Sequence, residues 1–316
     1  MSETAALGSY SVNFDDVQQA HARVAALIHR TPVITCQAIN DWVGTNVFLK
    51  CENLQKTGAF KVRGAMNAVA QLSDSELAAG VVTHSSGNHA GAIAAAARQF
   101  GCQAHIVMPN NSPSVKKAAV RFYGGQITEC EPTQADREKV SSEIQAATGA
   151  VMIPPFDHRH VIAGQGTCAK ELLEQQPDLD AIVSPVGGGG LVSGTVISAR
   201  HFQPGITVWG AEPLGADDAF QSKQKNERQP QLAPNTICDG LRTGLGNLTW
   251  PYVRDQVDEI LLADDEETVV AMRFAWERSK LIIEASSAVV LAALKKKIAM
   301  LEHDAVPKKV GVIIGG

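Results

Sequence analysis

The chain has 316 residues, more than one typical domain, and this length predicts a large core divided between two lobes. Its formal charge of −5, with both signs interspersed, excludes the concentrated basic surface of a nucleic-acid-binding protein. No apolar run approaches the ~18 residues of a membrane span, and residues 1–13 lack the cationic start and apolar centre of a signal peptide, so we expect a soluble cytoplasmic protein.

The cysteines support that location. All six are spread singly along the chain, without a Cys-x-x-Cys pair, and each neighbourhood has the pattern of a strand or helix interior. We expect reduced thiols in the core.

The N-terminal part of the chain predicts one helix and two short strands. Asn13 can cap a helix whose apolar residues recur at helical spacing until about residues 29–30. Short β-like runs follow at residues 33–36 and 46–50. The segment Lys56 to Gly64 then leads into a helix that passes through residues 66–72.

Lys61, at or just inside the start of that helix, is the first candidate for a catalytic amine. A lysine attacks a carbonyl group only when it is unprotonated, and apolar or cationic neighbours shift its pKa in that direction. Phe60, Val62 and Arg63 supply both kinds of neighbour. A solvated surface lysine is the alternative reading of this segment alone.

The next segment pairs a buried strand with a polar turn. Residues 81–84 predict the strand, and the turn Ser85-Ser-Gly-Asn-His89 leads into an alanine-rich helix over residues 90–100. Turns of this kind direct main-chain N–H groups toward an anion. The alternative is that Ser85 or Ser86 only caps the helix.

Strands and helices then alternate. Strands are predicted at residues 103–108, 126–130 and 151–155, and Thr133 with Asp136 resembles a capping box between the second and the third. This alternation predicts an α/β fold with open, mostly parallel sheets, and Pro154-Pro155 is a candidate crossing between the lobes. A helix over residues 164–173 follows.

Four consecutive glycines form the strongest single signal. They connect a predicted buried strand at residues 181–186 to a helix that begins at Leu191. Glycines let the main chain approach a ligand closely, and a helix start directs free N–H groups at it, so we expect a phosphate here. The pattern is neither Gly-x-Gly-x-x-Gly nor a P-loop, which disfavours dinucleotides and nucleoside triphosphates. A flexible hinge is the alternative.

The last third of the chain adds one acidic loop to the α/β pattern. A strand over residues 206–211 ends in Glu212 to Asp218, whose two end carboxylates can share a hard cation, with a solvated loop as the alternative. Two amphipathic helices over residues 266–280 and 286–300 and a strand over residues 309–314 complete the chain.

These motifs, in this order, resemble the fold type II enzymes that depend on pyridoxal phosphate (PLP), in the branch of the serine racemases and of the dehydratases of serine, threonine and 3-hydroxyaspartate. The similarity covers nearly the whole chain and includes residues 29–32, 52–64, 83–89, 161–167 and 185–190. It implies a tryptophan synthase β-like architecture with two three-layer α/β/α lobes. We expect residues 1–72 and 158–316 to form the large cofactor-binding domain and residues 73–157 to form the small domain.

The resemblance assigns a role to each candidate residue. It makes Lys61 the Schiff-base lysine and the base on one face of the cofactor, with Ser86 as the matching group on the other face. The implied cofactor-binding residues are Phe60, Lys61, Asn88, Gly187, Gly188, Gly189, Gly190, Leu191, Glu284 and Gly315. The implied substrate-binding residues are Ser85, Ser86, Gly87, His89, Arg137 and Thr243.

The resemblance also implies a divalent metal, Mg²⁺ or else Mn²⁺ or Ca²⁺, held by Glu212, the Ala216 carbonyl and Asp218. It implies a homodimer and leaves ATP binding open, because the match at the ATP-binding positions is partial. One departure concerns the C-terminal residues. Relatives usually carry Ser, Thr or Cys before the final Gly-Gly, whereas this chain reads Val312-Ile-Ile-Gly-Gly316, so the contact to the pyridine nitrogen stays open.

We therefore expect a PLP-dependent lyase that eliminates water from a β-hydroxy amino acid and gives a 2-oxo acid and ammonia. Serine racemisation as the main activity is one alternative, and a catalytically silent regulatory protein of the same fold is another. The cationic run Asp157 to His160 predicts the substrate, because Arg159 or His160 together with Arg137 can pair with the second carboxylate of 3-hydroxyaspartate. A solvated loop is the alternative for this run.

Overall fold

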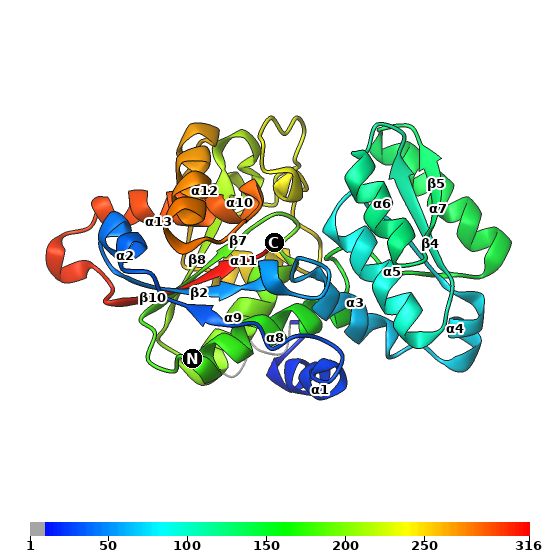
Figure 1. The fold of residues 1–316 in the computed structure, drawn as a ribbon, viewed down its shortest axis with the longest axis horizontal. Helices are drawn as coiled ribbons and strands as arrows, with labels where there is room; N and C mark the ends of the chain where they lie inside the picture. Colours follow the sequence, from blue (N-terminus) through cyan, green and yellow to red (C-terminus); the bar gives the residue numbers. More distant parts are fainter. Residues whose placement is uncertain (1–9) are drawn as a thin grey trace.

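The computed structural model describes residues 10–316 and shows two lobes side by side, each built on its own sheet (Figure 1). The N-terminal part and the last half of the chain surround the larger sheet, and the smaller sheet uses strands between residues 81 and 152. Within residues 10–316, no helix combines the length and the apolar character that crossing a membrane requires.

The six-stranded sheet has the order β1-β2-β10-β7-β8-β9. Its strands are β1 (Val33–Ile34), β2 (Asn46–Cys51), β7 (Ala181–Pro185), β8 (Thr207–Pro213), β9 (Glu259–Ala263) and β10 (Lys309–Ile314). Only the edge pair β1–β2 is antiparallel. The C-terminal strand lies at the centre of the sheet, where Val312 is level with Leu49 on β2 and Val183 on β7. Strand ends far apart in sequence therefore meet at one edge of the sheet.

Helices cover both faces of this sheet, and the resulting three layers bury two hydrophobic cores. On one face lie α2 (Gln37–Val43), α12 (Asp265–Ser279) and α13 (Ala285–Ala299). On the other lie α1 (Phe14–Val24), α8 (Arg159–Gln175), α9 (Gly190–Phe202), α10 (Asp218–Lys225) and α11 (Trp250–Gln256). Figure 1 shows α12 and α13 above the strands and α1, α8 and α9 below them.

The smaller sheet is entirely parallel, with the order β5-β4-β3-β6. Its strands are β3 (Val81–His84), β4 (Ala104–Pro109), β5 (Gln126–Cys130) and β6 (Val151–Met152). The helices of this lobe are α4 (Asp74–Ala79), α5 (Asn88–Phe100), α6 (Ser114–Phe122) and α7 (Gln134–Thr148). The mixed α/β class with mostly parallel sheets that the sequence predicts is confirmed.

Helix α3 (Lys61–Val69) lies where the lobes meet and packs against α8 of the large lobe and α5 of the small lobe. The contact with α8 depends on glycine, because a Cβ on Gly164 would lie 2.6 Å from the Cα of Gly64. A Cβ on Gly194 of α9 would likewise lie 2.4 Å from the Gly166 nitrogen of α8. These contacts bring α3, α8 and α9 close together and fix the start of α3.

Several predicted boundaries need correction. Helix α8 begins at Arg159 rather than at residue 164, and α5 begins at Asn88 rather than at residue 90. The predicted capping box at Thr133 is half formed: Thr133 accepts the Asp136 N–H at 3.2 Å, but the Asp136 carboxylate accepts from Glu131 instead. Five short elements were not predicted, namely α2, α4, α10, α11 and β9.

Candidate active site

The amine of Lys61 lies at the junction of the two lobes. Lys61 is the first residue of α3, and its Nζ donates a hydrogen bond to the Pro155 carbonyl at 2.8 Å. The same nitrogen lies 5.1 Å from the centre of the Phe60 ring. Burial lowers the pKa of the amine to about 8, because an ammonium ion loses its hydration there. About a tenth of this amine is therefore unprotonated at pH 7, far more than for an exposed lysine.

The turn that precedes α5 supplies main-chain and hydroxyl groups near the lobe junction. Gly87 is the N-cap of α5, and no side chain caps this helix, so the alternative that Ser85 or Ser86 caps it is wrong. The Ser85 hydroxyl instead accepts the Gly87 N–H at 3.3 Å. Residues 85–88 are part-buried, which leaves the turn accessible to a small ligand.

His89, the second residue of α5, is buried and neutral. Its Nε2 lies 3.0 Å from the Ile153 carbonyl, so this nitrogen carries the proton. Burial is the main cause that lowers its pKa to about 3, and the nearby Lys61 charge acts in the same direction. Its Nδ1 is buried without a hydrogen-bond partner among residues 10–316. His89 can therefore contribute polarity to the site without adding a charge.

Asn88 connects the small lobe to the large one. Its amide Nδ2 donates to Glu284 Oε2 at 2.8 Å, and Glu284 is the N-cap of α13. Burial raises the pKa of Glu284, and the bond from Asn88 opposes that shift. The Glu284 N–H donates to the Gly316 carbonyl at 3.0 Å, so the end of β10 joins the same group. A Cβ on Gly315 would approach the Phe60 ring to 3.2 Å, which places Gly315 against that ring.

The four glycines between β7 and α9 are buried and tightly packed. Gly189 is the N-cap of α9 and has a φ of +87°, a conformation that favours glycine. A Cβ on Gly188 would lie 2.2 Å from the Phe156 ring, and one on Gly189 would lie 2.8 Å from the Thr249 side chain. The Thr249 hydroxyl also donates to the Gly188 carbonyl at 2.8 Å. Such packing contradicts the hinge alternative and leaves a rigid, glycine-lined helix start.

Two predicted substrate-binding residues have different surroundings. Thr243 lies beside the glycine loop, because a Cβ on Gly187 would approach its hydroxyl to 3.4 Å. Arg137, on α7, has a buried Nε without a hydrogen-bond partner among residues 10–316. Burial lowers the pKa of His84 at the end of β3, and the Arg137 charge acts in the same direction while Glu138 opposes it. Arg137 therefore lies near the turn that contains Ser85.

The cationic run at residues 157–160 does not supply the predicted carboxylate contact. The side chain of Arg159 is 55% exposed and pairs with Asp16 of α1 at 3.3 Å. His160 faces the same side, since its pKa is lowered by burial and by Arg159 and Arg23. The Asp157 carboxylate accepts the Leu248 N–H at 2.7 Å. Helical geometry at the start of α8 turns Arg159 toward α1, so its predicted role in the substrate site is wrong.

The acidic loop after β8 contains a pair of buried carboxylates. Burial and the neighbouring Asp218 raise the pKa of Glu212, although its two oxygens accept N–H groups of Ala219 and Phe220 at 3.2 and 2.9 Å. Burial raises the pKa of Asp218 to about 6. Ala216 is buried between them in sequence, at the end of η4 (Leu214–Ala216). Burial of both carboxylates makes the alternative of a solvated loop wrong.

The sequence did not identify the residues that shape the site from a distance. Pro155 and Phe156, which contact Lys61 and the glycine loop, follow a strand in a segment interpreted only as a lobe crossing. Thr249 lies 61 residues beyond Gly188 and has no local motif. The Pro154-Pro155 pair was the only signal nearby.

Comparison with known proteins identifies the class to which this site belongs. The family model of the pyridoxal-phosphate dependent enzymes matches residues 24–316, and the chain therefore belongs to that family. The resemblance stated from the motifs, the dependence on PLP and the assignment as an enzyme are confirmed, and a catalytically silent protein is disfavoured.

Individual relatives narrow the comparison. The chain is 46% identical over 308 residues to the serine racemase of Dictyostelium discoideum, and the aligned region covers 97% of this chain and 94% of that protein. It is 46% identical over 307 residues to the beta-hydroxyaspartate dehydratase of Paracoccus denitrificans, and the aligned region covers 97% of this chain and 96% of that protein. The structure of maize serine racemase matches with a TM-score of 0.95 and 45% identity, over 97% of this chain and 94% of that one.

The chemistry of the donor groups fits PLP. A primary amine is available for the cofactor's aldehyde at the lobe junction, and a glycine-lined helix start is available for its phosphate. Two buried carboxylates whose pKa values are raised mainly by burial fit a hard cation in the same way. Among residues 10–316, no three His, Cys, Asp or Glu side chains gather as a metal site, so such a cation also needs a main-chain ligand.

Proposed function

We propose that this protein is a PLP-dependent dehydratase that converts a β-hydroxy amino acid to a 2-oxo acid and ammonia, with racemisation of the same substrate as an accompanying activity. The observation that carries the proposal is the Lys61 amine, which is part-buried at the lobe junction, hydrogen-bonded to a main-chain carbonyl and shifted to a pKa of about 8. A general base works best when its pKa lies near the operating pH.

Lys61 and Ser86 are the proposed proton-transfer groups. Lys61 anchors the cofactor covalently and removes the α-proton from one face of the substrate. Ser86 accepts or donates a proton on the opposite face. Elimination requires only one of these groups, whereas inversion of configuration requires both. The serine racemase relatives support inversion as the second candidate activity.

When bound, PLP supplies an electron sink that stabilises negative charge at the substrate α-carbon. Phe60 would pack against its ring, and Asn88, held by Glu284, would donate to its 3′-oxygen. Gly187 to Gly190 and the Leu191 N–H would hold its phosphate at the start of α9. Gly315 lies against Phe60 and offers no side-chain donor or acceptor to the pyridine nitrogen.

The substrate carboxylate is proposed to bind at the turn before α5. Ser85, Ser86 and Gly87 surround it with donors together with the main-chain N–H of His89, because the ring proton of His89 faces Ile153, and Thr243 lines the pocket beside the glycine loop. Holding this carboxylate fixes the α-hydrogen perpendicular to the cofactor plane. The α-proton and the β-hydroxyl then leave as water, and the released enamine takes up water to give the 2-oxo acid and ammonia.

Arg137 is the proposed determinant of substrate choice. Its Nε is buried without a hydrogen-bond partner among residues 10–316, and we propose that the guanidinium pairs with a second carboxylate, which 3-hydroxyaspartate has and serine lacks. A charge-assisted bond of this kind contributes about 1.5–3 kcal/mol, or roughly a tenfold to hundredfold preference in kcat/KM. The beta-hydroxyaspartate dehydratase relative supports this choice.

The test measures 2-oxo acid formation from serine, threonine and each 3-hydroxyaspartate stereoisomer, with chiral chromatography of the remaining substrate. We expect one 3-hydroxyaspartate isomer to have the highest kcat/KM and Arg137→Gln to narrow its advantage about tenfold or more. Arg159→Gln is the matched control, because Arg159 pairs with Asp16 on the surface. Serine or threonine reacting faster than every 3-hydroxyaspartate isomer would contradict the substrate assignment.

Three further proposals concern the whole molecule. Glu212, the Ala216 carbonyl and Asp218 bind Mg²⁺, with Mn²⁺ or Ca²⁺ as substitutes. The protein forms a homodimer, which the exposed Leu54 and Ile282 side chains support, and ATP binding stays open. Residues 1–72 and 158–316 form the cofactor-binding domain, and residues 73–157 form the small domain. The protein is cytoplasmic, which the unpaired cysteines support.

A further inference from the structure

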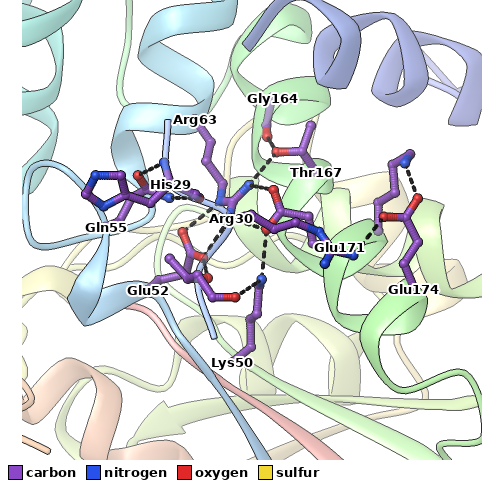
Figure 2. A network of polar contacts seen from close by, with 12 residues as sticks. His29, Arg30, Lys50, Glu52, Gln55, Arg63, Gly164, Thr167, Glu171 and Glu174 are labelled. Atoms are coloured by element: carbon purple, nitrogen blue, oxygen red, sulfur yellow. Dashed lines mark hydrogen bonds and ion pairs between the residues drawn. The ribbon is translucent and has the colours of Figure 1, made fainter. Parts of the chain in front are cut away.

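Two cations and two anions are completely enclosed in the protein beside the lobe junction. Lys50, Glu52 and Arg63 are each 0% exposed and Glu171 is 1% exposed. Figure 2 shows the Arg63 guanidinium between the carboxylates of Glu52 and Glu171, with the Lys50 amine approaching from the sheet side. Their formal charges sum to zero.

Arg63 is the centre of this network. Its Nε and Nη2 donate to the two oxygens of Glu52 at 2.7 and 2.8 Å, and its Nη1 and Nη2 donate to the two oxygens of Glu171 at 2.8 Å each. The Nη1 also donates to the Thr167 hydroxyl at 3.1 Å. All five guanidinium hydrogens therefore have acceptors, and both carboxylates are bound in a forked geometry that fixes direction as well as distance.

Lys50 occupies the same network without contacting α3. Its Nζ donates to Glu171 Oε2 at 2.7 Å, to the Thr31 carbonyl at 2.8 Å and to Gln175 Oε1 at 2.9 Å. Lys50 thus connects β2 to α8, both elements of the large lobe. Its burial and charge match those of Arg63, whereas its partners do not include the segment that begins with Lys61.

Stability alone does not account for such a cluster, because buried ion pairs are often no more stable than apolar side chains of the same volume. Its place in the fold offers another reason. Arg63 lies two residues after Lys61 in the first turn of α3, Glu52 begins η3 (Glu52–Leu54) directly after β2, and Glu171 lies on α8. No side chain caps the start of α3. The two forks of Arg63 therefore hold this first turn from two directions.

We propose that Arg63 is a positioning residue that acts through Lys61: its forked bonds to Glu52 and Glu171 fix the first turn of α3 and hold the Lys61 amine at the Pro155 carbonyl. The inference rests on the proposed role of Lys61 as the lysine that bonds the cofactor. The two cations and two anions of the cluster cancel, so the cluster adds no net charge beside Lys61. Burial is therefore the cause of the lowered Lys61 pKa. His89 of α5, the other titratable group beside Lys61, is neutral because burial lowers its pKa.

The experiment compares Arg63→Gln with Lys50→Gln in the holoenzyme. Both changes remove one buried cation from the same network and leave the same net charge, but only the first frees α3. We expect Arg63→Gln to lower kcat about a hundredfold with little change in KM, because a displacement of about 1 Å has that effect on a reacting group. Lys50→Gln should lower kcat less than about threefold at a comparable loss of melting temperature.

Arg63→Lys keeps the charge but loses the forked hydrogen bonds to both carboxylates. It replaces Arg63→Gln as the test variant if Arg63→Gln does not fold. We expect its kcat to lie between those of the wild type and Arg63→Gln. Two readouts other than activity complete the test. Visible circular dichroism reports the orientation of the bound cofactor, and amide hydrogen exchange reports the order of residues 61–69. Both should change in the Arg63 variants and stay as in the wild type in Lys50→Gln.

Equal losses of kcat and of cofactor dichroism in Arg63→Gln and Lys50→Gln would overturn the proposal, because the network would then act only on stability. Wild-type kcat and dichroism in Arg63→Lys would overturn it as well. Failure of the Lys61 assignment is recognised separately: in that case Lys61→Ala retains the Schiff-base absorbance of the wild-type holoenzyme.

Discussion

The packing of Phe156 against the glycine loop leads to a quantitative prediction for Gly188→Ala. A Cβ on Gly188 would lie 2.2, 2.3 and 2.4 Å from three ring carbons of Phe156, whereas carbon atoms in contact lie about 3.5–4 Å apart. The ring must therefore move by roughly 1 Å or more. Phe156 also lies against Gly190, where a Cβ would lie 3.1 Å from the Phe156 Cβ, so we expect the glycine loop to shift with it.

Overpacking of this kind costs about 1–3 kcal/mol. If the loop holds the cofactor phosphate, that energy lowers the affinity for PLP by about 5-fold to 150-fold, since 1.4 kcal/mol corresponds to a factor of about ten. The assay is the retained visible absorbance of the holoenzyme on dilution, with the melting temperature measured in parallel. Gly205→Ala is the matched control, because nothing lies within 4 Å of a Cβ at that position.

A double-mutant cycle tests the stated cause. In Gly188→Ala/Phe156→Ala the clash is absent, so we expect PLP affinity well above that of Gly188→Ala alone and a coupling energy of about 1–3 kcal/mol. Unchanged PLP affinity in Gly188→Ala, or a double variant no better than the single one, would refute the reasoning.

Three further predictions concern other groups of the site. Ser86→Ala should abolish racemisation more completely than elimination, because only inversion needs a group on both faces, and equal losses in the two assays would sink the two-face scheme. Mg²⁺ should raise the melting temperature in proportion to the logarithm of its concentration. The metal site would be contradicted if a chelator left the melting temperature unchanged and Asp218→Asn responded to Mg²⁺ as the wild type does. Folding lowers the pKa of His89 to about 3, so stability should fall by up to about 1.4 kcal/mol per pH unit below about 6.5, and denaturant melts of His89→Asn should show a flatter acid limb.

The sequence predicts the fold class and the position of the central motifs because these depend on local patterns. Strand–turn–helix alternation and the glycine run can be recognised within about ten residues of sequence. The helices α2 and α11 have only 7 residues each and β9 has 5, too few for a periodicity to show. Their existence depends on packing against α13, α9 and β8, which are distant in the sequence.

The site shows the same division. Lys61 and the glycine loop carry local motifs, whereas Phe156, Thr249 and the Pro155 carbonyl reach the site through long-range packing that no spacing reveals. Arg159 illustrates the opposite error, since three neighbouring cationic side chains indicated a carboxylate site. Only the start of α8 at that residue decides that Arg159 faces Asp16.

The bond between Lys61 and the cofactor is the central claim, and borohydride reduction of the holoenzyme followed by peptide mass spectrometry tests it most directly. Reduction makes the lysine–cofactor bond permanent, so the modified residue can be read from the peptide masses. The account predicts the label on the peptide that contains Lys61, and no label or turnover in Lys61→Ala. A label on another lysine, or near-normal turnover in Lys61→Ala, would contradict it.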